Sequence, residues 1–258
     1  MNLSVDRSIR RDRAIVTLGL LGVTALGWLY LVRLSREMAA MADTAMAMPQ
    51  MKPWDLPDFL LAFLMWAVMM VAMMMPSATP MILIFATVNR KRLAENTPGI
   101  RTGLFVLGYG AVWVAFSLLA ALGQWGLHTA ALVSGPAMTA APWLGGLLLL
   151  CAGAYQLTPL KNACLSRCQS PLGFILTEWQ EGTAGAIVMG LRYGLFCAGC
   201  CWMLMALLFV TGVMNLSWVA AIAGFVLVEK VFPVGRAVSR LAGGVLIVWG
   251  VWLISRAV

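Results

Sequence analysis

Three cysteines lie close together near the middle of one long apolar segment. Cys197, Cys200 and Cys201 are spaced i, i+3 and i+4 within residues 183–213, so in a helix their thiols would share one face. Two or three thiolates at close range form a high-affinity site for a soft metal ion. The same spacing would suit thiol redox chemistry, and a buried cysteine can also serve as a small apolar residue.

A second pair of cysteines, Cys164 and Cys168, occupies positions i and i+4 of the segment 158–182. If this segment is helical, the two thiols share a face as well. We assign the segment to the reducing side of a membrane, where clustered cysteines favour metal binding or redox function over structural disulfides. Cys151 stands alone, and we interpret it as a packing residue.

Methionines are concentrated in the apolar segment 59–88. Two adjacent rows follow a helical spacing of four: Met65, Met69 and Met73 in one row, and Met70 and Met74 in the other. A thioether is a soft ligand that suits Cu(I) better than Mg or Ca ions, although methionine also packs flexibly in ordinary cores. We expect Pro76 and Pro80 to interrupt the helix just beyond these rows. Ser77 and Thr79 could then satisfy the freed carbonyl groups.

The segment 35–58, which precedes these rows, consists largely of small and polar residues apart from its methionines. It holds five further methionines: Met38, Met41, Met46, Met48 and Met51. Thioethers in an aqueous loop would suit the capture of copper. The alternative is an interfacial helix that rests an apolar face on lipid.

The composition of the chain indicates the class of fold that holds these sulfur ligands. The chain has 258 residues, of which 62% are hydrophobic and only 11% are charged. A soluble globular protein carries about 25% charged residues. Soluble enzymes, disordered tails and secreted disulfide domains are therefore excluded, and an all-α polytopic membrane protein is indicated. No Walker, Rossmann or Ser/His/Asp pattern is present, so we do not expect an enzyme. The net charge of +8 gives no reason to infer nucleic-acid binding.

About seven segments are candidates to cross a bilayer, whose core of about 30 Å needs about 20 apolar residues in a helix. They are residues 14–34, 59–88, 103–127, 137–157, 183–213, 216–228 and 241–254. With a cytoplasmic N-terminus, most Lys and Arg residues fall on the cytoplasmic side, as the positive-inside rule requires. We therefore expect one integral membrane domain of residues 1–258. Its Met-rich loop 35–58 would lie outside and its Cys-containing loop 158–182 inside.

Two charged residues fall within the predicted spans. Arg192 lies about ten residues into the segment 183–213, and Glu229 ends the segment 216–228. Charges at membrane depth are rare and costly unless they are paired. The matching depths predict an Arg192–Glu229 pair, with Lys230, Glu178 or Glu181 as substitute partners.

Four blocks of this sequence resemble a bacterial family of predicted metal-binding integral membrane proteins that share a domain of unknown function. The blocks are residues 66–77, residues 155–161 with their continuation through Cys164, Cys168, Ser170 and Pro171, residues 194–205, and residues 212–216 followed by Glu229 and Lys230. The resemblance implies a multi-pass protein of the bacterial inner membrane that binds a metal.

The sulfur pattern favours membrane handling of a soft metal ion, above all the binding, transport or delivery of Cu(I). The ligands would run from the outer Met loop along the Met rows to Cys197, Cys200 and Cys201, and then to Cys164 and Cys168. The lipid bilayer and a metal donor or acceptor protein would be the partners. A membrane thiol redox protein is one alternative. Another is a scaffold or assembly subunit of a membrane complex, in which the cysteines only pack.

Overall fold

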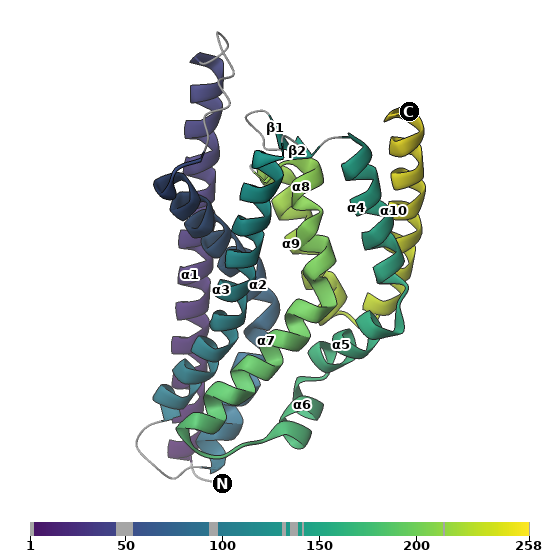
Figure 1. Ribbon diagram of the computed structural model, residues 1–258. Helices are drawn as coiled ribbons and strands as arrows, with labels where there is room; N and C mark the ends of the chain where they lie inside the picture. Colours follow the sequence, from purple (N-terminus) through teal and green to yellow (C-terminus); the bar gives the residue numbers. More distant parts are fainter. Residues whose placement is uncertain are drawn as a thin grey trace.

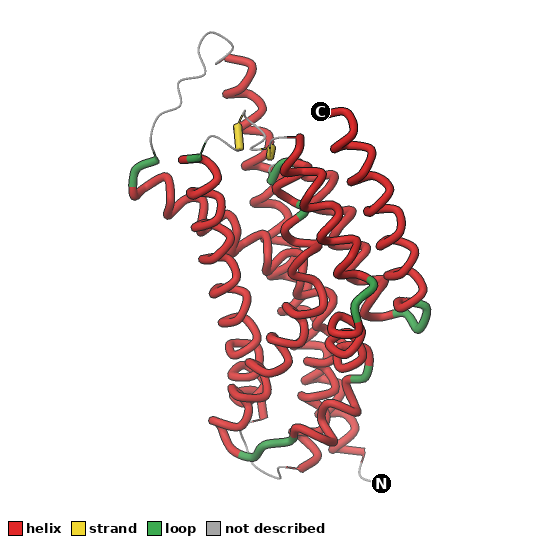
Figure 2. Tube along the Cα trace, turned by 45° about the vertical axis from the view of Figure 1, so that its right-hand side comes forward, coloured by secondary structure: helices red, strands yellow, loops and turns green. Residues whose placement is uncertain are grey.

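The computed structural model describes residues 3–44, 54–92, 98–130, 133–134, 139–140, 142–213 and 215–257. Almost all of this part of the chain is helical, as the composition predicts (Figures 1 and 2). The helices are α1 (Leu3–Thr44), α2 (Leu56–Arg92), α3 (Pro98–Thr129), α4 (Pro142–Gln156), α5 (Pro159–Gln169), α6 (Pro171–Glu178), α7 (Gly182–Ala206), α8 (Leu208–Thr211), α9 (Leu216–Val231) and α10 (Gly235–Ala257). Two short strands, β1 (Val133–Ser134) and β2 (Thr139–Ala140), pair antiparallel before α4.

Five candidate spans in the described residues are long and apolar enough to cross a membrane. They lie in α1, α2, α3, α7 with α8, and α10. The pair α4 and α5 passes the same test but bends by 64° at its break, which raises the number to six. The sequence predicts about seven spans. The difference is α9, which at 16 residues is shorter than the roughly 20 that a perpendicular crossing needs.

Three segment boundaries differ from the sequence-based expectations. Helix α1 continues to Thr44, so the first part of the predicted outer loop is helical, while Met46, Met48 and Met51 lie outside the described residues. The predicted fourth span, residues 137–157, contains β2 near its start, and α4 begins only at Pro142. The predicted inner loop is folded into α5 and α6. Each of these helices begins with a proline, whose fixed φ and missing N–H suit a first helical position.

The predicted interruption of the second span is wrong, because α2 is helical through both of its prolines. Pro76 and Pro80 remove the amide donors to the carbonyls of Ala72 and of Pro76 itself. The neighbouring hydroxyls bond other carbonyls: Ser77 Oγ donates to Met74 O at 3.0 Å, and Thr79 Oγ1 donates to Met75 O at 2.9 Å.

The helices form two groups that α9 connects. Helices α1, α2, α3 and α7 pack in one group, α4 and α10 pair along their length, and α9 contacts members of both (Figure 1). An apolar cavity of about 360 Å³ lies between the groups, with Leu204, Trp218 and Trp249 in its wall. The sulfur-bearing helices α2 and α7 both belong to the first group, so the packing of that group sets their positions relative to each other.

Helices α3 and α7 approach each other so closely that glycine is required at the contact. A Cβ at Gly190 would overlap the carbonyl oxygen of Phe105, and a Cβ at Gly108 would overlap that of Ile187. Small residues of this kind let helix backbones approach in membranes. The contact fixes the position of α7, which carries three of the cysteines.

We expect Gly190→Ala to lower the free energy of unfolding by about 1–3 kcal/mol or more, because the obstructing atoms are backbone. Gly110→Ala on α3 is the matched control, since nothing lies within 4 Å of its added Cβ. Thermal unfolding of the purified protein in detergent measures both. Equal midpoints for the two variants would contradict the close contact.

Candidate metal centre

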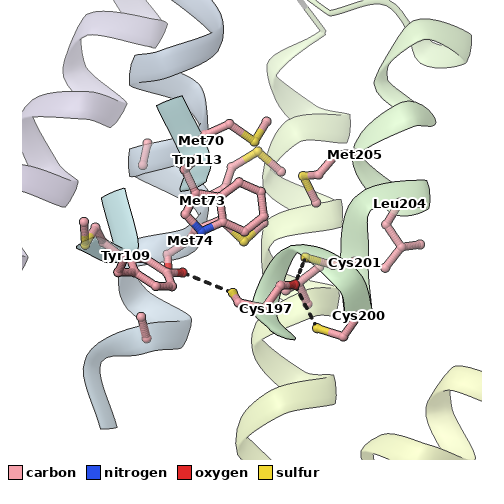
Figure 3. Packing of buried hydrophobic residues seen from close by; sticks show 14 of the residues in the cluster. Met70, Met73, Met74, Tyr109, Trp113, Cys197, Cys200, Cys201, Leu204 and Met205 are labelled. Atoms are coloured by element: carbon pink, nitrogen blue, oxygen red, sulfur yellow. Dashed lines mark hydrogen bonds between the residues drawn. The ribbon is translucent and has the colours of Figure 1, made fainter. Parts of the chain in front are cut away.

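All five methionines of the predicted rows lie in the protein interior. Met65, Met69, Met70, Met73 and Met74 are each at most 4% exposed. Figure 3 shows that Met70, Met73 and Met74 project from α2 toward the space in front of α7, where Met205 meets them. Of these five, Met74 is the one whose sulfur contacts the polar groups around the cysteines, as described below.

The three cysteines of α7 share one buried helix face, as their spacing predicts. Cys197, Cys200 and Cys201 are each 1% exposed. The thiols of Cys200 and Cys201 donate to the carbonyl oxygen of Cys197 at 3.1 and 3.0 Å, which orients both side chains back along the helix (Figure 3). The Cys197 thiol itself lies 3.2 Å from the hydroxyl of Tyr109 on α3.

The ammonium group of Lys230, on α9, lies at the centre of this sulfur group. Its Nζ is 2.8 Å from Cys197 Sγ, 3.9 Å from Cys201 Sγ and 3.9 Å from Met74 Sδ. Ser77 Oγ of α2 is 3.4 Å away. Lys230 is only 5% exposed. Three sulfur atoms from two helices therefore surround one buried cation, and we call Met74, Cys197 and Cys201 the sulfur site.

The cysteines of the predicted inner loop extend this group toward the surface. Helix α5 packs against α7, and Cys168 is buried in the same cluster of side chains as Cys197 and Cys200. Cys164 is half-buried, and its sulfur lies beside Gly199 of α7, where an added Cβ would come within 2.9 Å of it. The i, i+4 spacing on a helix is thus confirmed, with Cys168 inside and Cys164 nearer the exterior.

The described residues contain no group of three or more His, Cys, Asp or Glu side chains with the arrangement of a metal site. The sulfur site combines two thiols with one thioether, a set that only a soft ion would favour. Hard ions such as Mg²⁺ and Ca²⁺ require oxygen ligands. The donor chemistry therefore restricts the candidates for cargo to soft metal ions.

The predicted Arg192–Glu229 pair is wrong. Arg192 pairs instead with Glu178 of α6, one of the substitute partners named from the sequence, and its side chain is 48% exposed, so it lies at the edge of the bundle. Glu229 pairs with Lys161 of α5, with Nζ and Oε1 2.7 Å apart. Depth along a helix does not determine the direction in which a side chain points, and this explains the error.

The site predicted from the sequence did not include two buried residues, Lys161 and Lys230. Lys161 was assigned to a loop, but α5 buries it completely and Gln156 provides a second acceptor. Lys230 was considered only as a substitute for Arg192 in pairing with Glu229. The usable signal was the adjacent Glu229–Lys230 in an apolar segment, because two neighbouring charges there require two separate partners.

Comparison with known proteins provides an independent result. A family described as PpoB2, copper chaperone, matches residues 63–253, about three quarters of the chain. The chain belongs to this copper chaperone family. The matched range includes every residue of the sulfur site. The match shows a copper-related family, in line with the metal binding that the four sequence blocks imply. No curated protein and no solved structure matches this chain.

Proposed function

We propose that this member of the copper chaperone family binds Cu(I) inside a membrane helix bundle and passes it to an acceptor protein. The observation that carries the proposal is the sulfur site. Cys197, Cys201 and Met74 converge from two helices on a single buried position that already accommodates a positive charge. Thiolate and thioether ligands together suit soft metal ions such as Cu(I).

The arrangement of the remaining sulfur atoms supports a path for the ion. Met74 is preceded on α2 by the other buried methionines of the two rows, Met65, Met69, Met70 and Met73. Helix α5, which packs against α7, carries the buried Cys168 and the half-buried Cys164. Thioethers bind more weakly than thiolates, so affinity would rise from the Met rows toward the cysteines. This gradient favours movement from the methionines to Cys164.

The same proposal places the protein in the bacterial inner membrane with its N-terminus in the cytoplasm. An ion pair of 2.5 Å between Arg90 and Asp12 supports this orientation, because it brings the basic end of α2 to the arginine-rich start of α1. The two ends of the chain lie at opposite ends of the bundle (Figure 1), which fits an odd number of crossings such as seven. The positive-inside rule then assigns the basic end to the cytoplasm.

The proposal is tested by titrating the reduced full-length protein with Cu(I) under anaerobic conditions against a competing chelator. We expect about one tightly bound Cu(I) and no comparable binding of Mg²⁺ or Ca²⁺. The triple variant Cys197→Ser, Cys200→Ser, Cys201→Ser should lose this copper. A triple variant that keeps the full copper content would refute the assignment of the cysteines of α7 as ligands.

A further inference from the structure

Lys230 has an unusual environment for a buried lysine in this protein. The other buried lysine, Lys161, contacts a carboxylate at 2.7 Å. No carboxylate in the described residues lies within ion-pair distance of Lys230, and the adjacent Glu229 is already paired with Lys161. The closest contact of its ammonium is the sulfur of Cys197 at 2.8 Å. A cysteine side chain is therefore the nearest group that could balance this charge.

The ammonium of Lys230 and a metal ion in the sulfur site cannot be present together. An ion that binds Cys197, Cys201 and Met74 must lie between these sulfur atoms, in the space that Nζ fills. Two unit charges at van der Waals distance repel each other strongly in a low-dielectric interior. Copper binding therefore requires the lysine side chain to move.

The structure offers a place for the displaced side chain. A cavity of about 380 Å³ lies at the turn between α9 and α10, and Lys230 forms part of its wall together with Gln169, Phe232 and Arg236. Phe232 and Arg236 are exposed, so the cavity reaches the surface of the bundle. The flexible four-carbon stem of lysine can turn its ammonium from one side of α9 toward such a cavity.

From these observations we propose that the Lys230 ammonium holds the metal position of the sulfur site in the copper-free protein, and that copper displaces it into the cavity at the α9–α10 turn. The proposal rests on the copper-binding function given above. In the exchange, one Cu(I) enters and one ammonium leaves the sulfur atoms while keeping its proton. Any proton on a ligating thiol passes to water, and no oxidation or reduction occurs.

This exchange has a consequence for the delivery of copper. The free energy of copper binding is reduced by the cost of expelling Lys230 from its contacts. When copper departs, the ammonium returns and neutralises the vacated thiolate. Lys230 thus makes a strong soft-metal site releasable, which a protein that hands its cargo onward requires.

The first test is the substitution Lys230→Leu, which removes the competing cation and adds no sulfur ligand. We expect Cu(I) affinity to rise at least about tenfold, measured by chelator competition with the reduced protein. Arg240→Gln is the matched control, because it removes one exposed positive charge of α10 that lies in neither the sulfur site nor the cavity. Unchanged or weaker affinity in the Lys230→Leu protein, at normal folded yield, would overturn the proposal, since a lysine that merely balances charge would strengthen binding.

The second test uses the unmodified protein and therefore does not depend on how a variant folds. The protein is treated with an amine-acylating reagent with and without Cu(I), and modification of each lysine is measured by mass spectrometry. Copper should increase the modification of Lys230 several-fold. Lys161 should stay protected because its pairing does not change, and exposed Lys91 should react equally in both states.

The outcomes separate this inference from the proposed function. If copper binds and Lys230 remains as protected as Lys161, the displacement is wrong while the copper site stands. If the reduced wild-type protein binds no Cu(I), the proposed function fails, and the displacement fails with it.

Discussion

Replacing Glu229 with leucine is expected to lower the free energy of unfolding by about 3–5 kcal/mol, the usual cost of breaking a buried ion pair. The carboxylate of Glu229 lies 2.7 Å from Lys161 Nζ, and the two side chains are 1% and 0% exposed. Without Glu229, the Lys161 ammonium would remain buried with only Gln156 Oε1 as an acceptor. Water cannot reach it to compensate the charge.

Lys161→Leu should have an effect of similar size, because it leaves the Glu229 carboxylate buried and unpaired. The double variant Lys161→Leu, Glu229→Leu should recover much of the loss, since no isolated charge remains. Urea or thermal unfolding of the purified protein in detergent measures the complete cycle. If the two single losses simply add, the residues do not act as partners.

Arg192→Leu is the matched control for this cycle. It breaks the Arg192–Glu178 ion pair, but the arginine side chain is 48% exposed. Exposed pairs contribute at most about 1 kcal/mol. If Arg192→Leu lowered the free energy of unfolding strongly and Glu229→Leu lowered it only slightly, the assignment of Glu229 to the buried pair would be wrong.

The Lys161–Glu229 pair also bears on the candidate metal centre. It connects α5, which carries Cys164 and Cys168, to the end of α9, which carries Lys230. Gln169 of α5 adds a hydrogen bond from Nε2 to the carbonyl oxygen of Glu229 at 2.8 Å. The ion pair and this hydrogen bond therefore hold α9, which brings Lys230 to the sulfur site, against α5.

Helical periodicity was sufficient to predict which sulfur atoms share a face. Cys197, Cys200 and Cys201 share a buried face of α7, as their spacing requires, and the two Met rows are buried on α2. Composition was sufficient for the class of fold, because a chain with 11% charged residues cannot cover a soluble surface. The shared face follows from the spacing of neighbouring residues, and the fold class follows from the overall composition. Both can be read from a single sequence.

The partners across helices could not be predicted in the same way. Glu229 was assigned to Arg192 because both lie at similar depth, yet Glu229 turns toward α5 and Arg192 toward α6. Lys161 could be found only after the segment 158–182 was recognised as helical. The proline at the start of each of its helices was a local signal for that. The rotation of one helix about its axis relative to another depends on the packing of the whole bundle.

The second large effect is expected at Cys197, whose sulfur makes the shortest contact with the cation position. Cys197→Ser replaces a thiolate ligand with a hydroxyl, which is a hard and weakly basic donor for Cu(I). We expect the affinity for Cu(I) to fall at least about a hundredfold, equivalent to about 2.7 kcal/mol. Chelator competition with the reduced protein measures the change. The exposed Cys151 lies apart from the cluster, and Cys151→Ser should leave the affinity unchanged.

Cys164→Ser distinguishes a binding ligand from an exit ligand. Cys164 is half-buried beside Gly199 and does not belong to the sulfur site, so its loss should change the equilibrium affinity by no more than a few fold. If copper leaves through Cys164, the same substitution should slow the transfer of bound Cu(I) to a chelator added in excess. Stopped-flow measurement of that transfer gives the rate directly. Equal transfer rates in the wild-type and Cys164→Ser proteins would remove Cys164 from the path.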